Sequence, residues 1–286
     1  SSDLVDKINE FSNAEKVVAG CVGIVALKVL YNLTLKRKPI SVKGKTVLIT
    51  GSNGAIGQGL CKGFAKNNYR VIGIDLGANS IGGTNSYLSI DLNRLCTDAN
   101  YCNQAIKEIR NSCDNRLDVL INNAATQIIA PIKTLSFDSW NKTINVNLNS
   151  AFVLIKALLS MLEEAHGDVI NIASIHAQLT KPDFSAYAVS KAGLIGLTKA
   201  LSVELGALIK INAISPAAIS TPMLEAGFDG DQKLRNKLNS CHPTTGIGTV
   251  EDVVSAALYL SKCGVFINGS IIDIDGGISS RLHDPV

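Results

Sequence analysis

The sequence has few aromatic residues and little excess of charge of either sign. Aromatic residues make up 5% of the 286 residues, and the formal net charge is +3. Proteins that bind single-stranded nucleic acid stack the bases on aromatic side chains, and proteins that bind duplexes carry clustered lysine and arginine. The lysines and arginines of this chain are scattered, without a basic stripe. We therefore expect no nucleic-acid partner.

Cysteine motifs for metal binding are also absent. The seven cysteines include no Cys-x-x-Cys pair, and the closest spacing, from Cys96 to Cys102, matches no zinc motif. An odd number of unpaired cysteines is typical of reduced, mostly buried thiols inside a cell. We predict no metal site and an intracellular, cytoplasmic location.

Apolar residues are plentiful by contrast. Hydrophobic residues make up 46% of the chain and charged residues only 18%, so the chain can build a core and is too apolar for disorder. The length suits one large α/β domain with an appendage, or two small domains.

The appendage is predicted at the N-terminus, in residues 1–43. Within it, Val17–Leu35 is strongly apolar, and a helix of this length would span roughly 28 Å, close to the thickness of a bilayer core. Lys28 and Asn32 interrupt the run on one face. Three interpretations remain open: a membrane span, an interfacial helix, or a soluble helix on a neighbouring subunit. We favour contact of residues 17–35 with a membrane.

The charges beside this segment bear on its orientation. The basic cluster Lys36–Lys38 follows the apolar run, whereas a secretory signal peptide carries its positive charges in front. If the segment spans a membrane, the cluster predicts that the large domain stays on the cytoplasmic side.

From residue 44 to residue 280 the pattern alternates between strands and helices. Continuous apolar strands separated by helices predict a doubly wound parallel sheet, the Rossmann fold, in a single domain covered on both faces, followed by a tail at 281–286. The expected strands are Thr46–Thr50, Arg70–Asp75, Ser86–Asp91, Asp118–Asn122, Asp168–Ser174, Lys210–Ile214 and Ser270–Ile274. The expected helices are Gly57–Asn67, Cys102–Cys113, Trp140–Glu164, Ser185–Leu205 and Val250–Ser261.

A glycine-rich turn follows the first expected strand. Gly51, Gly54 and Gly57 stand between this strand and a helix, where glycine lets the backbone approach a pyrophosphate at the helix N-terminus. The second strand ends in Asp75, whose carboxylate can accept both ribose hydroxyls of an adenosine and would repel a 2′-phosphate. No cation follows Asp75 directly. The sequence therefore favours NAD over NADP as cofactor, although Asp75 would also suit a turn or a helix cap.

Several motifs in the expected order resemble those of the short-chain dehydrogenase/reductase family. The resemblance covers roughly residues 44–280 and leaves the N-terminal segment unexplained. The matching motifs are Thr50-Gly-x-x-x-Ala55-x-Gly57, Asn122-Asn123-Ala124-Ala125, Asn147, Ser174, Tyr187-x-x-x-Lys191 and Asp275-Gly276-Gly277. One departure is Ala217 after Pro216, where the family usually has glycine.

The resemblance implies an NAD-dependent enzyme acting on an alcohol or ketone, in a homodimer or homotetramer packed through the long helices. It implies that Asn147, Ser174, Tyr187 and Lys191 form the catalytic site, with Asn147 anchoring a water that links Lys191 to solvent. Asp91 would contact adenine, or would simply end a strand. The implied cofactor-binding residues are Gly51, Asn53, Ile56, Gly57, Asp75, Asp91, Leu92, Asn123, Ala124, Tyr187, Lys191 and Ile219.

The chemistry of these residue types is consistent with that role. Tyr187 and Lys191 are four residues apart, so they share one face of a helix. A nearby ammonium is expected to lower the pKa of a tyrosine, which then serves as an acid and base near neutral pH. The Ser174 hydroxyl can hold a substrate oxygen while charge develops on it. His176 either faces the substrate or is structural.

The substrate is not specified by the sequence. Loops at Gln127–Leu135, Ala177–Phe184 and Ser220–Thr245 follow expected strands, where specificity resides in this architecture. Met223, Leu224 and Phe228 in the third loop would form an apolar lid, and the charged residues around them are expected to face solvent. The alternative function is a catalytically idle structural or regulatory subunit of a membrane-associated assembly.

Overall fold

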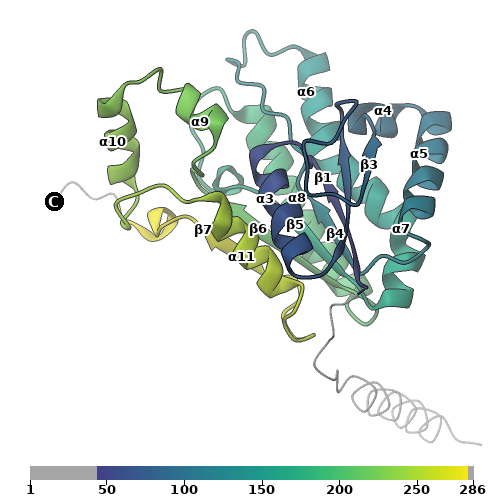
Figure 1. Cartoon of the computed structure of the whole chain (residues 1–286). Coiled ribbons are helices and arrows are strands. Elements are labelled where there is room, and N and C mark those ends of the chain that lie inside the picture. The colour runs from purple at the N-terminus through teal and green to yellow at the C-terminus, as the bar shows by residue number, and fades with distance from the viewer. Residues whose placement is uncertain (1–43, 283–286) are drawn as a thin grey trace, which may run out of the picture. The chain divides into compact units, whose positions relative to one another are not determined.

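The computed structural model describes residues 44–282 and contains the predicted parallel sheet (Figure 1). Seven strands pair in the order β3-β2-β1-β4-β5-β6-β7, and every pair is parallel. The strands are β1 Thr46–Thr50, β2 Arg70–Asp75, β3 Ser86–Ser89, β4 Val119–Asn122, β5 Asp168–Ile172, β6 Lys210–Pro216 and β7 Ile271–Ile274. The predicted fold class is confirmed.

The central strands are apolar along their whole length because both faces of the sheet are covered. Val47 and Ile49 of β1 belong to one core, and Leu48 between them belongs to the other. Successive side chains of a strand point to opposite faces, so a strand covered on both faces carries no polar alternation.

Helices form a layer on each face. α3 (Ala55–Lys66) and α11 (Val250–Leu260) pack on each other and cover one face, in front of the sheet in Figure 1. α5 (Ala99–Ser112), α7 (Ser150–Ala165) and α8 (Ser185–Leu205) supply the opposite core. The remaining helices are α4 (Leu92–Thr97), α6 (Phe137–Ile144), α9 (Pro222–Ala226) and α10 (Gln232–Cys241), with short η1 (Asn145–Asn149), η2 (Ile175–Ala177) and η3 (Ile278–Ser280).

The helix expected at Trp140–Glu164 is present within the continuous helical stretch Phe137–Ala165, in which α6, η1 and α7 follow one another. The turn η1 is π-helical, so the hydrogen-bond register widens there. One expectation about a loop was wrong. The segment Ser220–Thr245, expected as a loop, contains α9 and α10. The Asp231 carboxylate caps α10 by accepting from the backbone N–H groups of Lys233 and Leu234.

The hydrophobic stretch Phe137–Ala165 is long and apolar enough to cross a membrane by length and composition alone. Its apolar residues include Leu154, Leu158 and Leu162 of α7, whose side chains are buried in the core between this helix and the sheet. A core helix of this kind satisfies the same criteria, so the stretch is weak evidence for a membrane span. The predicted segment 17–35 lies outside the described residues.

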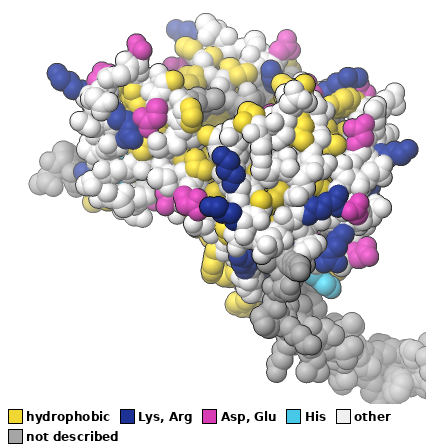
Figure 2. All heavy atoms as spheres, in the orientation of Figure 1, with side chains coloured by type: hydrophobic (Ala, Val, Ile, Leu, Met, Phe, Trp, Pro, Cys, Tyr) yellow, Lys and Arg dark blue, Asp and Glu magenta, His cyan; other side chains and the backbone are white. Residues whose placement is uncertain are grey.

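The described surface carries both signs of charge. On the face drawn in Figure 2, lysine and arginine side chains are interspersed with aspartate and glutamate. The described cysteines are all free thiols, but only Cys61 and Cys113 are fully buried. The other four are partly buried, at helix and loop positions.

Candidate active site

The glycine-rich turn between β1 and α3 is packed too closely for any side chain at two positions. Gly51 has φ +66°, and a Cβ there would lie 2.8 Å from the Ala124 Cα. A Cβ on Gly57 would lie 2.0 Å from the Gly51 carbonyl oxygen. Both glycines are thus required by the fold of the turn itself.

The N-terminus of α3 is open to a ligand. Gly54 is the N-cap residue and offers no side-chain cap, so the N–H groups of the first turn, which includes Ile56, have no side-chain partner at the cap. Such a helix end attracts negative charge through its N–H groups and its dipole. The turn therefore fits the pyrophosphate of a dinucleotide.

Asp75 lies beside this turn at the end of β2. One carboxylate oxygen accepts from the backbone N–H of Asn53 at 2.8 Å and the other from that of Leu76 at 2.7 Å. These two bonds fix the carboxylate next to the glycine-rich turn.

Thr50 and Asn123 join the turn to β4. The Thr50 hydroxyl accepts from the backbone N–H groups of Asn123 and Ala124, each at 3.0 Å. The Asn123 side chain donates to the carbonyl oxygens of Thr50 at 2.9 Å and Gly51 at 3.1 Å. The predicted cofactor residues of both segments are thereby brought together.

Ser174 and Tyr187 meet after β5. Ser174 is buried and precedes η2, and its Oγ accepts from the backbone N–H of His176 at 3.2 Å. The Ser174 hydroxyl partly lowers the pKa of the Tyr187 phenol, so the two side chains lie close to each other.

Lys191 lies one helical turn beyond Tyr187 and is almost completely buried. Its Nζ lies 5.7 Å from the centroid of the Tyr187 ring and donates to the Ile172 carbonyl oxygen at 2.6 Å. Burial lowers the pKa of Lys191 to about 8, because desolvation disfavours the ammonium.

Asn147 is buried in the π-helical turn η1. Its Oδ1 accepts from the Thr126 backbone N–H at 2.8 Å, and its Nδ2 donates to the Thr126 carbonyl and to the Ser190 Oγ, each at 3.0 Å. Ser190 in turn donates to the Tyr187 carbonyl oxygen at 2.7 Å. The turn thus ties Asn147 to the helix that carries Tyr187 and Lys191.

The expected direction of the Tyr187 pKa shift was wrong. Burial raises the pKa of Tyr187, and the hydrogen bond with Ser174 only partly offsets this. Desolvation disfavours the charged phenolate, and the Lys191 ammonium is directed to a carbonyl oxygen. The phenol therefore stays protonated through neutral pH.

The buried lysine leads to a prediction about stability. Its folded pKa of about 8 lies below its ordinary 10.5, so between these values the unfolded chain binds a proton that the folded chain has released. Protonation therefore favours unfolding, and the contribution of Lys191 to stability should increase as pH rises from about 8 to about 10.5. Urea denaturation at pH 7.5 and pH 10 should show wild type gaining stability relative to Lys191→Met.

The matched control is Lys199→Met on the exposed side of α8, which makes the same substitution without emptying a buried position. A Lys191→Met difference that is constant or shrinks with pH would contradict the shift.

His176 is in contact with Tyr187. Its ring stacks on Phe184 with centroids 4.5 Å apart and meets the Tyr187 ring edge-on at 5.7 Å. Burial, and then the charge of Lys181, lowers the pKa of His176. A neutral ring beside Tyr187 suits both the structural and the substrate-facing interpretation.

The other predicted positions have varied surroundings. The Asp91 carboxylate caps α4 by accepting from the N–H groups of Asn93 at 2.8 Å and Arg94 at 3.2 Å, and the Leu92 side chain is part of the core. Ile219 is buried and bridges to Gly248 beyond α10. Ala217 does not have a positive φ, so its turn does not require glycine.

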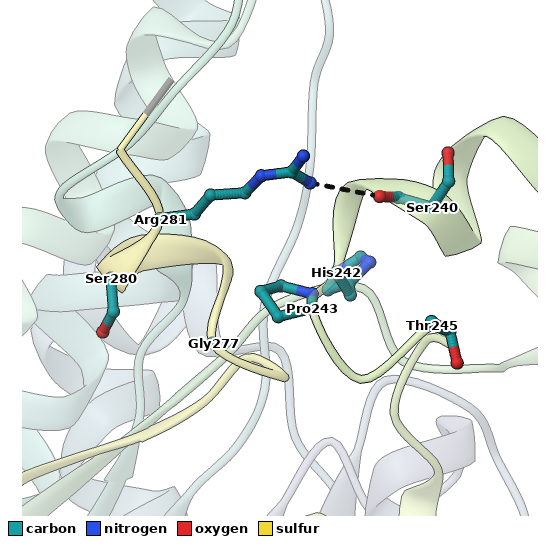
Figure 3. Close-up of a pocket in the computed structure, with 7 residues that line it drawn as sticks. All are labelled: Ser240, His242, Pro243, Thr245, Gly277, Ser280 and Arg281. Carbon is teal, nitrogen blue, oxygen red and sulfur yellow. Dashed lines mark hydrogen bonds between the residues drawn. The ribbon is translucent and has the colours of Figure 1, made fainter. Parts of the chain in front are cut away.

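Gly277, the last residue of the Asp-Gly-Gly motif, lines a separate pocket of about 610 Å³ (Figure 3). A Cβ on Gly276 would lie 2.4 Å from the Thr244 Oγ1, so the glycines let the segment after α10 lie against them. Arg281 crosses the opening and donates to the Ser240 carbonyl oxygen at 3.3 Å. None of the predicted site residues lines this pocket.

An ion pair joins the two helices of the segment that was expected to form a lid, Ser220–Thr245. Arg235 of α10 forms a 3.1 Å ion pair with Glu225 of α9, and Glu225 also accepts from the Ser220 Oγ at 2.8 Å. Leu224 and Phe228 are half-buried, and the expected solvent-facing charges at Asp229, Asp231, Lys233 and Lys237 are exposed.

Several supporting residues were not predicted from the sequence. Thr50 belongs to the motif of the glycine-rich turn and Ser190 lies between Tyr187 and Lys191, so their positions in these motifs could have marked them as supporting residues. Thr126 and Tyr87 contact site residues across long distances in sequence, and no local pattern marks them. Within residues 44–282, no group of three or more histidine, cysteine or acidic side chains is placed to hold a metal ion.

Comparisons with known proteins agree with this geometry. Residues 51–279 match the family model described as Enoyl-(Acyl carrier protein) reductase. The chain is 35% identical to 2-dehydro-3-deoxy-D-gluconate 5-dehydrogenase of Bacillus subtilis, over 84% of this chain and 97% of that protein.

Two solved structures are similar over most of the chain. One is 4-hydroxyisoleucine dehydrogenase complexed with NADH, with a TM-score of 0.76, 30% identity and coverage of 84% of this chain and 100% of that chain. The other is ElxO with NADP bound, with a TM-score of 0.74, 30% identity and coverage of 83% and 100%.

Proposed function

Because the chain belongs to the short-chain dehydrogenase/reductase family, we propose that it is an NAD-dependent oxidoreductase acting on an alcohol or carbonyl carbon. The observation that carries the proposal is that Ser174 and Lys191 lie around Tyr187, while Asn147 is bonded to Ser190 of the helix that carries Tyr187 and Lys191. Several of these side chains are buried and polar, and each has a partner that fixes its position.

In this proposal each residue has a distinct task. The nicotinamide, when bound, supplies or accepts the hydride. Ser174 Oγ binds the substrate oxygen, and the Tyr187 hydroxyl gives a proton to that oxygen in reduction or takes it in oxidation. Lys191 would hold the bound cofactor from the helix that also carries Tyr187, and Asn147 fixes that helix through its bond with Ser190.

The proposed choice of NAD rests on Asp75. Its carboxylate is fixed beside the glycine-rich turn by two backbone N–H groups, and the segment Leu76–Asn85 that follows contains no lysine or arginine. A ribose with free hydroxyls can donate to this carboxylate, whereas a 2′-phosphate would meet its negative charge. The two similar solved structures hold different dinucleotides, so the family alone does not decide between them.

Removing the charge of Asp75 should shift the cofactor preference. We expect Asp75→Asn to change the ratio of NADH to NADPH affinity by roughly ten-fold or more toward NADPH, as for the loss of a hydrogen bond to a charged group. Fluorescence titration of both dinucleotides measures the ratio. Asp273→Asn on the exposed side of β7 makes the same change of charge far from the turn and should leave the ratio alone. An unchanged ratio in Asp75→Asn would contradict the assignment.

The activity itself is tested with a panel of secondary alcohols and NAD⁺, followed by NADH absorbance. Turnover of at least one alcohol that depends on Tyr187 supports the proposal. Turnover that survives without the Tyr187 hydroxyl would sink the assigned mechanism.

Assembly and location are part of the same proposal. We propose a homodimer or homotetramer packed through the long helices, supported by Phe152 of α7 and Val189 of α8, which expose 45% and 48% of their surface. Membrane contact through residues 17–35 remains a proposal about a segment outside the described range.

A further inference from the structure

The side-chain amide of Asn53 forms its hydrogen bonds within the protein. Its Nδ2 donates to the Asn79 carbonyl at 2.9 Å and to the Tyr87 hydroxyl at 3.2 Å, and its Oδ1 accepts from the Ile81 backbone N–H at 3.0 Å. A carbonyl can only accept and a backbone N–H can only donate, so these partners fix the orientation of the amide.

Tyr87 completes the connection from β3. Its hydroxyl donates to the Gly77 carbonyl at 2.5 Å while it accepts from Asn53. Burial, and then the charge of Asp75, raises the pKa of Tyr87, so the phenol keeps the proton that it donates. One side chain from the glycine-rich turn and one from β3 thereby fix the segment 76–81 between them.

Asp75 directly precedes this segment, at the end of β2. Its carboxylate accepts from the Asn53 and Leu76 backbone N–H groups, one on each side of the connection. Asn53 therefore contacts the carboxylate through its backbone and the following loop through its side chain. Any movement of the loop is transmitted to the group on which the choice of dinucleotide depends.

We propose that Asn53 and Tyr87 form a clasp that fixes the β2–β3 loop beside Asp75, and that both are positioning residues for recognition of the adenosine ribose. The inference rests on the proposed function, because it assigns the clasp to dinucleotide selection. Asn53 affects dinucleotide binding indirectly, by holding the loop and the Asp75 carboxylate in place. Its side-chain amide already bonds to the protein and is not available to bind a 2′-phosphate.

The test uses the full chain with Asn53→Ala and Tyr87→Phe. Each variant removes clasp bonds, so NADH should bind roughly five- to ten-fold more weakly and the preference over NADPH should shrink. The matched control is Asn79→Ala, since Asn79 contributes only its backbone carbonyl. The double variant Asn53→Ala with Tyr87→Phe should lose less affinity than the sum of the two single losses, because both act on one connection.

Hydrogen exchange of the Ile81 amide gives a readout that needs no cofactor. In wild type and in Asn79→Ala this amide should be protected, and in Asn53→Ala it should exchange faster. Faster exchange together with weaker NADH binding supports the clasp. Weaker binding with unchanged Ile81 exchange would mean that Asn53 contacts the dinucleotide directly, and unchanged values of both quantities would also overturn the proposal.

The outcomes separate the clasp from the proposed function. If wild type binds neither dinucleotide, the proposed function fails while Ile81 exchange still decides whether the clasp exists. If Asn53→Ala does not fold, Tyr87→Phe retains the ring but loses the bonds to Asn53 and Gly77. It should weaken NADH binding and, because Asn53 is then held less firmly, speed Ile81 exchange to a smaller extent.

Discussion

Replacing Tyr187 by phenylalanine is expected to lower kcat by roughly a hundred- to ten-thousand-fold, the range typical of losing a positioned acid or base. The substitution removes only the hydroxyl that pairs with Ser174 and keeps the ring that meets His176. NADH affinity should stay within a few-fold of wild type, because the glycine-rich turn and Asp75 are untouched. Steady-state kinetics and NADH titration of the same preparations measure both quantities.

The control for this substitution is Tyr259→Phe on α11, whose side chain is 54% exposed and far from the motifs in sequence. It should retain full turnover. A Tyr187→Phe protein as active as the control would contradict the assigned role, and one that also loses NADH binding would indicate a structural defect.

The same residue determines the expected pH dependence. Burial raises the pKa of Tyr187, so the phenol remains a proton donor through neutral pH. Reduction of a carbonyl, which needs the donor, should therefore be nearly flat there, whereas oxidation of an alcohol, which needs the phenolate, should rise with pH. An oxidation rate that falls as pH increases from 7 to 9 would contradict this assignment.

Substituting Gly57 by alanine should have the largest effect on the cofactor turn. The new Cβ would lie 2.0 Å from the Gly51 carbonyl oxygen and 2.9 Å from the Ser52 Cα, so backbone atoms must move. We expect a loss of about 1–3 kcal/mol in the free energy of unfolding, as for other overpacked sites. Dinucleotide affinity should fall roughly ten- to hundred-fold, because the turn no longer approaches the pyrophosphate closely. Urea denaturation and NADH titration measure the two losses.

Two other glycines provide controls. Gly54→Ala places its Cβ no closer than 3.4 Å to the Gly51 oxygen and should leave the stability close to that of wild type. Gly196→Ala has open space around it and lies inside α8, so it should leave dinucleotide affinity unchanged and raise the free energy of unfolding by about 0.5–1 kcal/mol. A Gly57→Ala protein that binds NADH like Gly196→Ala would contradict the role of the turn.

The sheet could be predicted from the sequence because its strands are buried on both faces. Thr46–Thr50 and Arg70–Asp75 have the predicted bounds, since each is a short apolar run between turn residues. Ser185–Leu205 likewise has its predicted bounds as α8. The bounds of such elements can be predicted from the residues of the segment and its immediate neighbours alone.

Other elements depend on contacts that no local pattern reveals. The π-helical turn at Asn145–Asn149 differs from its neighbours only in hydrogen-bond register, which side-chain periodicity does not report. The polar helix α10 carries no apolar stripe, although its Asp231 cap was a usable signal. The Asn53 clasp joins residues up to 34 positions apart, and the pKa of Tyr187 depends on burial by the whole fold.

The sequence predicted which residues lie at the site better than it predicted their charge states and hydrogen-bond partners. The motif residues Gly51, Asn123 and Thr50 pack together as their order suggested. Asp91, by contrast, uses its carboxylate as the cap of α4. Residue identity follows from motifs, but the charge state and the hydrogen-bond partners of a side chain follow from its surroundings.

The central claim is that this chain binds a nicotinamide dinucleotide at the glycine-rich turn and prefers NAD through Asp75. The most direct measurement is equilibrium titration of the full chain with NADH and, in parallel, NADPH, followed by fluorescence. Saturable NADH binding with clearly weaker NADPH binding is the predicted result. Binding of neither dinucleotide at millimolar concentration would contradict the account and favour a structural or regulatory subunit.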